Sequence, residues 1–281
     1  GAVAPGIDYT WRVTDDNDCE FTGTITIIQP EEITIQSVTA DNTTICEGEN
    51  INLHAEAIGG TPSLKYNWTG PNGYSANNSK DPVITNAGTS AEGYYVVTII
   101  DANNCSKKDT VFVTVYPLPA MTNPGNFTFC GGTTNGPISF SGDAGNTYTW
   151  TNNNTDIGLP ASGNTEIPEF TSPDSLDVPI VATITVIPTS VNNCEGEPET
   201  FTITINPKIE LSITNNTPTF CSNGIASIVL NSNVTGTTFH WDYSDGTPGD
   251  GGNLIEKFLT TDHTYSIYAE ANGCYSDTLP T

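Results

Sequence analysis

Short runs of β-branched and aromatic residues alternate along the chain with segments rich in glycine, proline, asparagine and aspartate. Such runs fit a pleated, half-buried surface and the intervening residues favour turns, so the pattern predicts strands. No stretch keeps a 3.6-residue period over three helical turns, which argues against amphipathic helices. We therefore predict an all-β protein, with its clearest strands at residues 21–28, 51–57, 94–100, 111–116, 180–187, 201–205 and 225–230.

A second pattern, built around cysteine, occurs four times. The sequence D-D-N-D-C ends at Cys19, D-A-N-N-C ends at Cys105, and weaker copies end at Cys194 and Cys274. The intervals between these cysteines are 86, 89 and 80 residues. Self-similarity at this period indicates a repeated structural unit, close in length to a small β-sandwich of about 100 residues.

A proline follows the last predicted strand of successive units, at Pro30, Pro117 and Pro207. Proline cannot donate a hydrogen bond within a central strand, so we place the domain boundaries there. Because short proline-marked linkers limit bending, we expect the sandwiches to form an extended rod. The predicted domains are the tail of a preceding repeat at 1–31, full domains at 32–118 and 119–208, and a last domain at 209–281, expected to be incomplete at its C-terminal end.

Each of the last three predicted domains contains a tryptophan preceded two positions earlier by an aromatic residue, at Trp68, Trp150 and Trp241. A tryptophan on the third strand, packed between two sheets, is typical of immunoglobulin-like sandwiches. The alternative interpretation is that these rings stack on sugars. Recurrence of a single tryptophan at the same place in every repeat favours the core role.

The charge balance narrows the range of partners. The chain has 7 Lys and Arg against 32 Asp and Glu, which gives a net charge of −25, although only 14% of residues are charged. A strongly acidic chain repels nucleic acid and anionic lipid surfaces. The apolar runs are all shorter than the roughly 18 residues of a membrane span. We therefore expect no nucleic-acid partner and no direct membrane insertion.

Seven cysteines and three histidines are present, and no two cysteines form a C-x-x-C pair. This spacing gives little support for zinc or iron–sulfur ligation. Cysteines at recurrent positions favour disulfides, which persist in oxidising, exported environments. The chain is therefore expected to be extracellular.

Several motifs resemble a known group of proteins. In the last domain W-D-Y-S-D-G-T, H-T-Y and N-G-C resemble a PKD (polycystic-kidney-disease) domain. Residues 32–118, with I-C-E-G-E-N-I-N-L and D-A-N-N-C, resemble Ig-like and PKD-like modules of giant surface proteins from Bacteroidetes bacteria. The opening V-T-D-D-N-D-C and I-I-Q-P are similar to the end of a repeat in SprB-type gliding-motility adhesins. Residues 119–208 keep Cys130, Trp150 and Cys194 but lack the D-x-N before the last cysteine.

The resemblance implies a stalk segment of a long adhesin filament on the bacterial cell surface, used for attachment or gliding motility and exported by type IX secretion. Its partners would be neighbouring domains of the same chain and an extracellular polysaccharide or other surface ligand. Two alternatives stay open. One is a glycan-binding module, with Trp11, Tyr74 and Tyr243 as candidate aromatics, and the other is a set of spacer domains attached to a secreted hydrolase.

The histidines His54, His240 and His263 are not placed beside a serine or cysteine by any local motif. A catalytic triad is recognised by geometry, so the order of residues cannot assemble one here. We predict no enzymatic activity and no organic cofactor.

Calcium is the one cofactor that the sequence suggests. Asp242, Asp245 and Asp250 lie in a glycine-rich segment, and calcium needs six to eight oxygen ligands. A second acidic cluster is Asp15, Asp16 and Asp18. The alternative for both clusters is turn chemistry, because aspartate and glycine form tight turns.

The resemblance also implies O-glycosylation, since Bacteroidetes modify Asp-Ser/Thr followed by a small apolar residue. That pattern occurs at Thr110, Ser175 and Thr278.

Two disulfide patterns remain open. The in-domain pattern joins Cys46 to Cys105, Cys130 to Cys194 and Cys221 to Cys274. However, Cys46 precedes a strand and Cys105 follows one, so a seven-residue strand of roughly 20 Å should separate them, whereas a disulfide needs Cα atoms within about 7 Å. The slightly favoured head-to-tail pattern joins Cys46 to Cys194 and Cys130 to Cys274, and leaves Cys19, Cys105 and Cys221 for domains outside residues 1–281.

Overall fold

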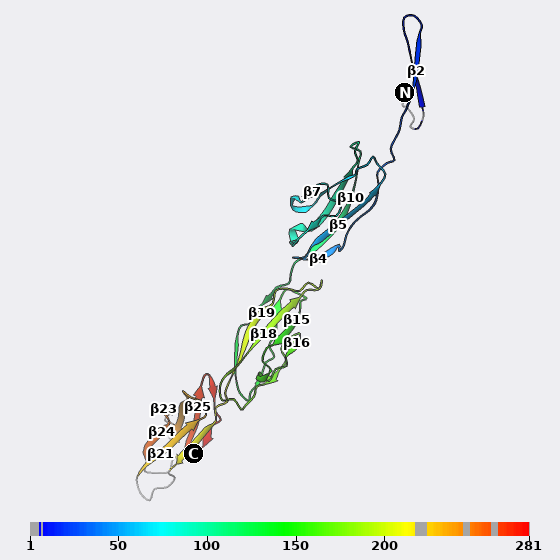
Figure 1. The fold of residues 1–281 in the computed structure, drawn as a ribbon. Helices are drawn as coiled ribbons and strands as arrows, with labels where there is room; N and C mark the ends of the chain where they lie inside the picture. The colour runs from blue at the N-terminus through cyan, green and yellow to red at the C-terminus, as the bar shows by residue number, and fades with distance from the viewer. Residues whose placement is uncertain (1–5, 7, 217–223, 244–247, 260–263, 281) are drawn as a thin grey trace. The chain divides into compact units, whose positions relative to one another are not determined.

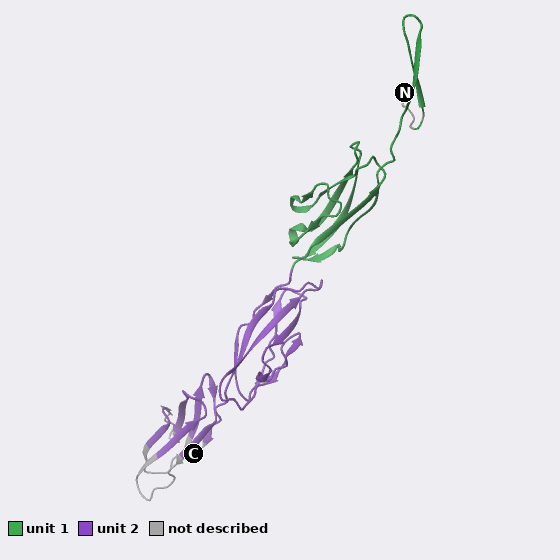
Figure 2. Cartoon of the chain, viewed as in Figure 1, with its two compact units in different colours: residues 1–117 green, residues 118–281 purple. Residues whose placement is uncertain are grey.

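The computed structural model describes the chain except for residues 1–5, 7, 217–223, 244–247, 260–263 and 281. It confirms an all-β protein, and the described residues contain no helix long and apolar enough to cross a membrane. Its only helical segments in that part of the chain are short 3-10 turns at Pro71–Gly73, Thr89–Ala91 and Thr155–Ile157. The chain divides into two compact units, Gly1–Pro117 and Leu118–Thr281 (Figure 2).

The first unit begins with an antiparallel hairpin of β1 (Asp8–Thr14) and β2 (Glu20–Thr26), which we call the first hairpin (Figure 1). Its register runs from Asp8 opposite Thr26 to Thr14 opposite Glu20. No other strand pairs with it among the described residues.

The rest of the first unit is an eight-stranded sandwich, sandwich 1. One sheet has the order β3-β5-β8 and the other the order β4-β10-β9-β6-β7. The short strand β4 pairs with β10 in parallel, and all other neighbours are antiparallel. The bounds are β3 (Thr34–Ala40), β4 (Thr44–Cys46), β5 (Ile51–Ile58), β6 (Lys65–Thr69), β7 (Ser75–Ala76), β8 (Val83–Ile84), β9 (Gly93–Ile100) and β10 (Ser106–Tyr116).

The core of sandwich 1 follows the two-residue period of its strands. In β9 the alternate residues Tyr95, Val97 and Ile99 are at most 1% exposed, while the residues between them face outward. They pack with Leu53 of β5 and Trp68 of β6, so the apolar faces of the two sheets meet. Burial of such faces is the main favourable contribution to folding.

Sandwich 2 has a five-stranded sheet of order β12-β19-β18-β15-β16, faced by the short ladders β11-β14 and β13-β17. As in sandwich 1, the first strand of the large sheet, β12, runs parallel to its last, β19. The bounds are β11 (Met121–Thr122), β12 (Phe127–Cys130), β13 (Thr134–Asn135), β14 (Ser141–Gly142), β15 (Thr147–Asn152), β16 (Ser162–Asn164), β17 (Phe170–Thr171), β18 (Ile180–Thr189) and β19 (Glu199–Asn206).

Sandwich 3 has a sheet of order β20-β21-β24 and a second sheet in which β23-β22-β25-β26 are neighbours and β27 pairs with β25. Its core includes Ile209, Leu230, Trp241 and Ile267. The bounds are β20 (Leu211–Asn216), β21 (Gly224–Ser232), β22 (Thr238–Tyr243), β23 (Pro248–Gly251), β24 (Leu254–Leu259), β25 (Tyr265–Ala271), β26 (Cys274–Tyr275) and β27 (Leu279–Pro280).

The recurrent tryptophans are core residues. Trp68, Trp150 and Trp241 are 0%, 2% and 9% exposed, on β6, β15 and β22. The indole N–H of Trp68 donates to the Ser79 carbonyl at 3.1 Å, and that of Trp150 to the Glu166 carbonyl at 3.3 Å. Buried in this way, these rings are not available to stack on a sugar, and the core interpretation is confirmed.

Candidate functional site: cysteine turns and the joint they form

The cysteine motifs fold into one type of turn. In sandwich 1, between β9 and β10, the Asp101 carboxylate accepts hydrogen bonds from the backbone N–H of Asn103 at 2.9 Å and Cys105 at 2.8 Å. Asn104 has φ +64°, in the left-handed region that asparagine tolerates. Aspartate is suited to the first position because its short side chain can bond to backbone groups two to four residues ahead.

The same turn recurs elsewhere in the chain. In the first hairpin the Asp15 carboxylate accepts from the N–H of Asn17 at 2.8 Å and Cys19 at 2.9 Å. In sandwich 2 the Ser190 hydroxyl accepts from the N–H of Cys194 at 3.2 Å. The sequence motif therefore encodes a local geometry that presents a cysteine at a fixed place.

The structure joins Cys130 to Cys274 by a disulfide, with a Cα–Cα distance of 5.7 Å. This is a head-to-tail pair between sandwiches 2 and 3, and it excludes the in-domain pairs Cys130–Cys194 and Cys221–Cys274. Cys19 and Cys105 are exposed free thiols, which also excludes Cys46–Cys105.

Cys46 and Cys194 are each disulfide-bonded, and the pairing of one with the other stays a prediction. Cys221 lies outside the described residues. The expected position of Cys46, in a turn, was wrong: it ends the short strand β4, opposite Tyr116 of β10. Cys130 holds the equivalent place at the end of β12, opposite Asn206.

Two further contacts and one buried residue lie near the Cys130–Cys274 bond. The Asn206 amide, 7% exposed, donates to the Asn272 carbonyl at 3.0 Å. Lys208 Nζ lies 3.7 Å from a carboxylate oxygen of Asp277. Ile209, the first residue of sandwich 3 after the linker, is 2% exposed. The joint thus combines a covalent bond, a part-buried hydrogen bond and an ion pair. Local sequence patterns did not reveal Asn206 and Asn272, because the pair is 66 residues apart.

The end of sandwich 1 that carries the Cys105 turn has features equivalent to those of sandwich 3 at its joint. The two charges of the ion pair are reversed, with the acidic residue in the linker. Ile33 is 3% exposed, and the preceding Glu32 pairs with Lys107 at 2.6 Å. This lysine donates a hydrogen bond that lowers the pKa of Glu32. Asp101 also accepts from the N–H of Thr61 at 3.0 Å, which fastens the cysteine turn to the loop before β6.

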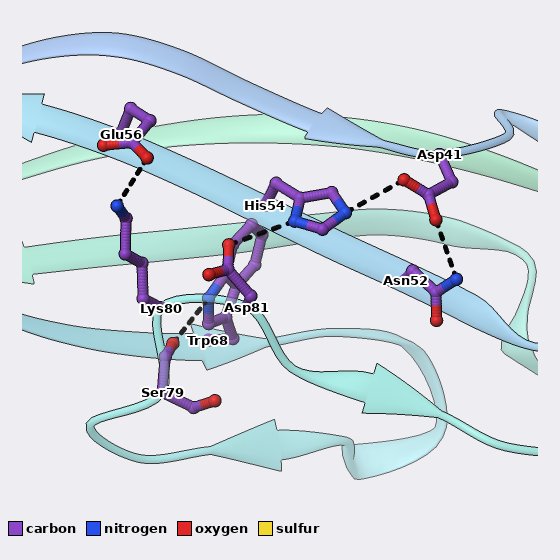
Figure 3. Close-up of polar contacts among 8 residues, drawn as sticks. All are labelled: Asp41, Asn52, His54, Glu56, Trp68, Ser79, Lys80 and Asp81. Atoms are coloured by element: carbon purple, nitrogen blue, oxygen red, sulfur yellow. Dashed lines mark hydrogen bonds and ion pairs between the residues drawn. The ribbon is translucent and has the colours of Figure 1, made fainter.

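A polar network covers one face of sandwich 1 (Figure 3). His54 on β5 lies between two carboxylates, with Nε2 2.9 Å from Asp41 and Nδ1 3.0 Å from Asp81. A neutral imidazole has only one N–H, so both contacts are satisfied only by the protonated ring. The hydrogen bond to Asp81 is the largest cause of the raised pKa of His54. Lys80 also pairs with Glu56, so the segment before β8 is tied to β5 at two points.

The other predicted site residues are not gathered into one place. For calcium, Asp242 is exposed on β22, whereas Asp245 and the side chain of Asp250 lie outside the described residues. The described residues contain no group of three or more His, Cys, Asp or Glu arranged for a metal. The candidate glycosylation residues Thr110, Ser175 and Thr278 are all exposed.

The candidate glycan-binding aromatics are also separate. Trp11 is 43% exposed on the first hairpin. Tyr74 packs edge-on against the buried Tyr95, with ring centroids 5.7 Å apart, and burial raises its pKa. The side chain of Tyr243 lies outside the described residues.

The histidines contact carboxylates and an aromatic ring. His54 lies between its two aspartates, and His240 stacks on Tyr268 at 4.8 Å with Glu270 3.6 Å from its Nε2. His263 lies outside the described residues. The absence of enzymatic activity stays a prediction.

The strand order and the buried tryptophans define tandem immunoglobulin-like sandwiches. No protein-family profile matches the sequence, and no curated protein matches it significantly.

Three solved structures illustrate the similarity in fold. The I-band fragment I67-I69 from titin has 10% identity, covers 90% of this chain and 97% of its own, and has a TM-score of 0.47. The three N-terminal domains of the bacteriophage RB49 outer capsid protein Hoc have 15% identity, with 88% and 95% covered and a TM-score of 0.34. Drosophila OTK extracellular domains 3-5 have 10% identity, with 90% and 97% covered and a TM-score of 0.36. With TM-scores below 0.5, the fold assignment rests on the strand order and core of this chain.

Proposed function

We propose that the chain is a stalk segment of a long extracellular adhesin, in which tandem sandwiches set the distance between an anchored end and a binding tip. The observation that carries this proposal is the joint around Cys130 and Cys274, where a disulfide and the Asn206–Asn272 hydrogen bond link two sandwiches. A fixed joint serves a spacer, whereas a catalytic pair of domains commonly needs to move. Disulfides persist in oxidising compartments, which supports the extracellular location.

The resemblance to SprB-type adhesins extends this proposal. On that basis the filament belongs to a bacterial cell surface, contributes to attachment or gliding motility and leaves the cell by type IX secretion. The PKD-like motif at Trp241 and the motif at Cys105 support the same assignment. Neighbouring domains are its first partners, and a polysaccharide or another surface ligand would bind at the tip.

The test measures whether the joint is fixed. In the 281-residue chain, residual dipolar couplings of sandwiches 2 and 3 should fit one common alignment tensor. In the double variant Cys130→Ser with Cys274→Ser, we expect two tensors of different magnitude, with chemical shifts inside each sandwich retained. Cys105→Ser is the matched control and should leave the common tensor unchanged. Peptide mapping without reduction that recovers Cys130 unlinked to Cys274 would overturn the proposal.

A glycan-binding role is the second candidate, and one feature favours it. A hollow of about 310 Å³ in sandwich 2 is lined by the half-buried rings of Phe140 and Tyr148, 5.5 Å apart, with the exposed Glu166 carboxylate at its edge. An aromatic wall with a few polar groups suits a neutral sugar ring. Saturation-transfer NMR with neutral oligosaccharides should detect binding that Glu166→Gln weakens. Equal signals from wild type and variant would reject this hollow as the site.

The spacer alternative differs only in what the sandwiches carry. Sequencing the coding region on either side separates the two, because a stalk predicts further repeats and a hydrolase spacer predicts a catalytic domain.

Calcium binding and O-glycosylation remain part of the proposal. We place calcium at Asp242, Asp245 and Asp250, where added calcium should raise the melting temperature and a chelator should reverse that rise. O-glycans are proposed on Thr110, Ser175 and Thr278, which intact-mass measurement of the native protein before and after substitution to alanine would detect.

A further inference from the structure

The first hairpin has one apolar face. Directly opposed residues of antiparallel strands point to the same side, so the pairs Trp11–Gly23 and Val13–Phe21 share a face. Trp11, Val13 and Phe21 are 43%, 61% and 68% exposed, and the rings of Trp11 and Phe21 lie 5.5 Å apart. Ile25 on the same face is 55% exposed. An isolated two-stranded hairpin is marginally stable in water. We therefore expect another part of the protein to pack on this apolar face.

Sandwich 1 shows what covers the equivalent face. Counting back from the cysteine, Trp11 corresponds to Val97, and Val13 corresponds to Ile99. Both Val97 and Ile99 are 0% exposed, because the opposite sheet of their own sandwich packs on them. The first hairpin therefore matches β9 and β10, but no strand in the described part of the chain opposes it.

The second observation is the end of sandwich 1 that carries Cys105. It repeats three features that sandwich 3 has at the Cys130–Cys274 joint: a buried isoleucine after the linker, an ion pair from the linker to a residue two or three positions after the cysteine, and a cysteine at the turn. In sandwich 3 that cysteine is bonded to the preceding sandwich, whereas Cys105 is an exposed free thiol. The end of sandwich 1 is thus built as a joint, and no strand among the described residues supplies its partner.

We infer that the first hairpin and Cys105 are two parts of a further joint of the same kind, completed by residues of the same chain that precede Gly1. Those residues would supply the sheet that covers Trp11, Val13 and Phe21. They would also supply a short strand parallel to residues 27–29 that ends in a cysteine. Cys46 and Cys130 each lie opposite the residue before a proline, at Tyr116 and Asn206, so the partner cysteine lies opposite Gln29, before Pro30. This inference rests on the proposed function.

Bond formation is an oxidation. The two cysteine thiols lose two electrons and two protons and form one S–S bond. The acceptor is the disulfide of an exported dithiol oxidoreductase, which is reduced to a dithiol by thiol–disulfide exchange.

The test compares the 281-residue chain with the natural chain extended before Gly1 by one complete repeat. In the shorter chain, Cys105 should react with a maleimide under native conditions. In the extended chain, peptide mapping without reduction should recover Cys105 linked to a cysteine before Gly1. Amide exchange in residues 9–25 should also slow by about 100-fold or more, because the hairpin joins a cooperative core. In the extended chain, Val13→Asp should reverse that protection, whereas Cys105→Ser should remove only the link.

Three results would overturn the inference: a free Cys105 in the extended chain, a Cys105–Cys19 bond, or hairpin exchange that is equally fast in both chains. A coding sequence with no cysteine-bearing repeat before Gly1 would also overturn the inference. Recovery of the Cys130–Cys274 peptide in the same digest separates the two proposals. If that peptide is present while Cys105 is free, the inference fails and the stalk function stands. If it is absent, the proposed function fails.

Discussion

The first hairpin and the hairpin of β9 and β10 have the same aspartate-capped cysteine turn but different surroundings. Val13 is 61% exposed, and the corresponding Ile99 is fully buried. Asp15 and Asp101 nevertheless make the same two bonds to backbone N–H groups. The comparison shows that a few consecutive residues fix the turn and the strand pairing, whereas burial depends on strands that come from elsewhere in the chain.

The largest difference between the two hairpins should come from removing a core side chain. Ile99→Ala leaves a cavity between two sheets and should lower the free energy of unfolding of sandwich 1 by about 2–5 kcal/mol. Val13→Ala, at the matching exposed position, should change the free energy of unfolding of the first hairpin by less than about 0.5 kcal/mol. Hydrogen exchange measured by mass spectrometry reports the first variant on peptides from β9 and β10 and the second on peptides from β1 and β2. Equal effects would mean that Val13 is covered in solution.

A second contrast uses glycines that lie opposite tryptophans. A methyl group on Gly163 would come within 2.4 Å of the buried Trp150 ring, and one on Gly23 within 2.4 Å of Trp11. Because Trp150 is 2% exposed and cannot swing aside, Gly163→Ala should destabilise sandwich 2 by about 1–3 kcal/mol. In Gly23→Ala, the exposed Trp11 side chain can turn into solvent. The thermal midpoint of this variant should therefore match that of the wild type. Calorimetry of both variants tests the contrast.

Asp101 and Asp15 cap the two cysteine turns, and removing either carboxylate should have a smaller effect on stability. Asp101→Ala leaves backbone N–H groups of Thr61, Asn103 and Cys105 without their acceptor, whereas Asp15→Ala leaves two donors that water can reach. We expect a clear fall in the melting temperature of sandwich 1 for Asp101→Ala and no resolved change for Asp15→Ala. If the two variants melt alike, the tie to Thr61 contributes nothing.

Low pH should destabilise sandwich 1 by protonating Asp101. Backbone hydrogen bonds, first that from Thr61, lower the pKa of Asp101 in the folded state. Its contribution is therefore present above the unfolded pKa of about 3.9 and is lost as the pH falls through the folded value. Asp101→Asn should flatten this acid limb in a denaturation series, and an unchanged limb would assign it to other carboxylates.

The smallest expected effect on stability comes from His54. Its contribution is lost as the pH rises, whereas that of Asp101 is lost as the pH falls. Its folded pKa is raised, so its contribution is complete below the unfolded pKa of about 6.5 and disappears as the pH rises through the folded value. The ring is 43% exposed and solvent screens the pairs, so the loss between pH 6 and pH 8 should be slight. His54→Gln should abolish this slope in urea titrations. A slope that persists in the variant would point away from the Asp41–His54–Asp81 contacts.

Much of the fold could be predicted from local sequence. Alternation placed β5 at 51–57 against the observed Ile51–Ile58, and β18 at 180–187 against Ile180–Thr189. Several short strands, β4 and β12 among them, were not predicted because three or four residues carry too little alternation. The error with Cys46 followed directly, since a strand that switches to the other sheet was mistaken for a turn.

The joint was less accessible to sequence reasoning. The Cys130–Cys274 pair could be derived from topology, because a disulfide tolerates only a short distance. The contacts of Asn206 with Asn272 and of His54 with two aspartates could not, since each joins residues from separate strands and turns. Asparagine and aspartate are so common in this chain that their positions alone carry little information.

The parallel pairing of β4 with β10, and of β12 with β19, has a consequence for how the sandwiches respond to force. If tension pulls the ends of sandwich 1 apart and frees β3, β4 is drawn toward its own start and β10 toward its own end. In a parallel pair these pulls slide one strand along the other, so the ladder bonds between them are loaded together. Single-molecule pulling should record an abrupt rupture for each of these sandwiches, and gradual opening would contradict this shear geometry.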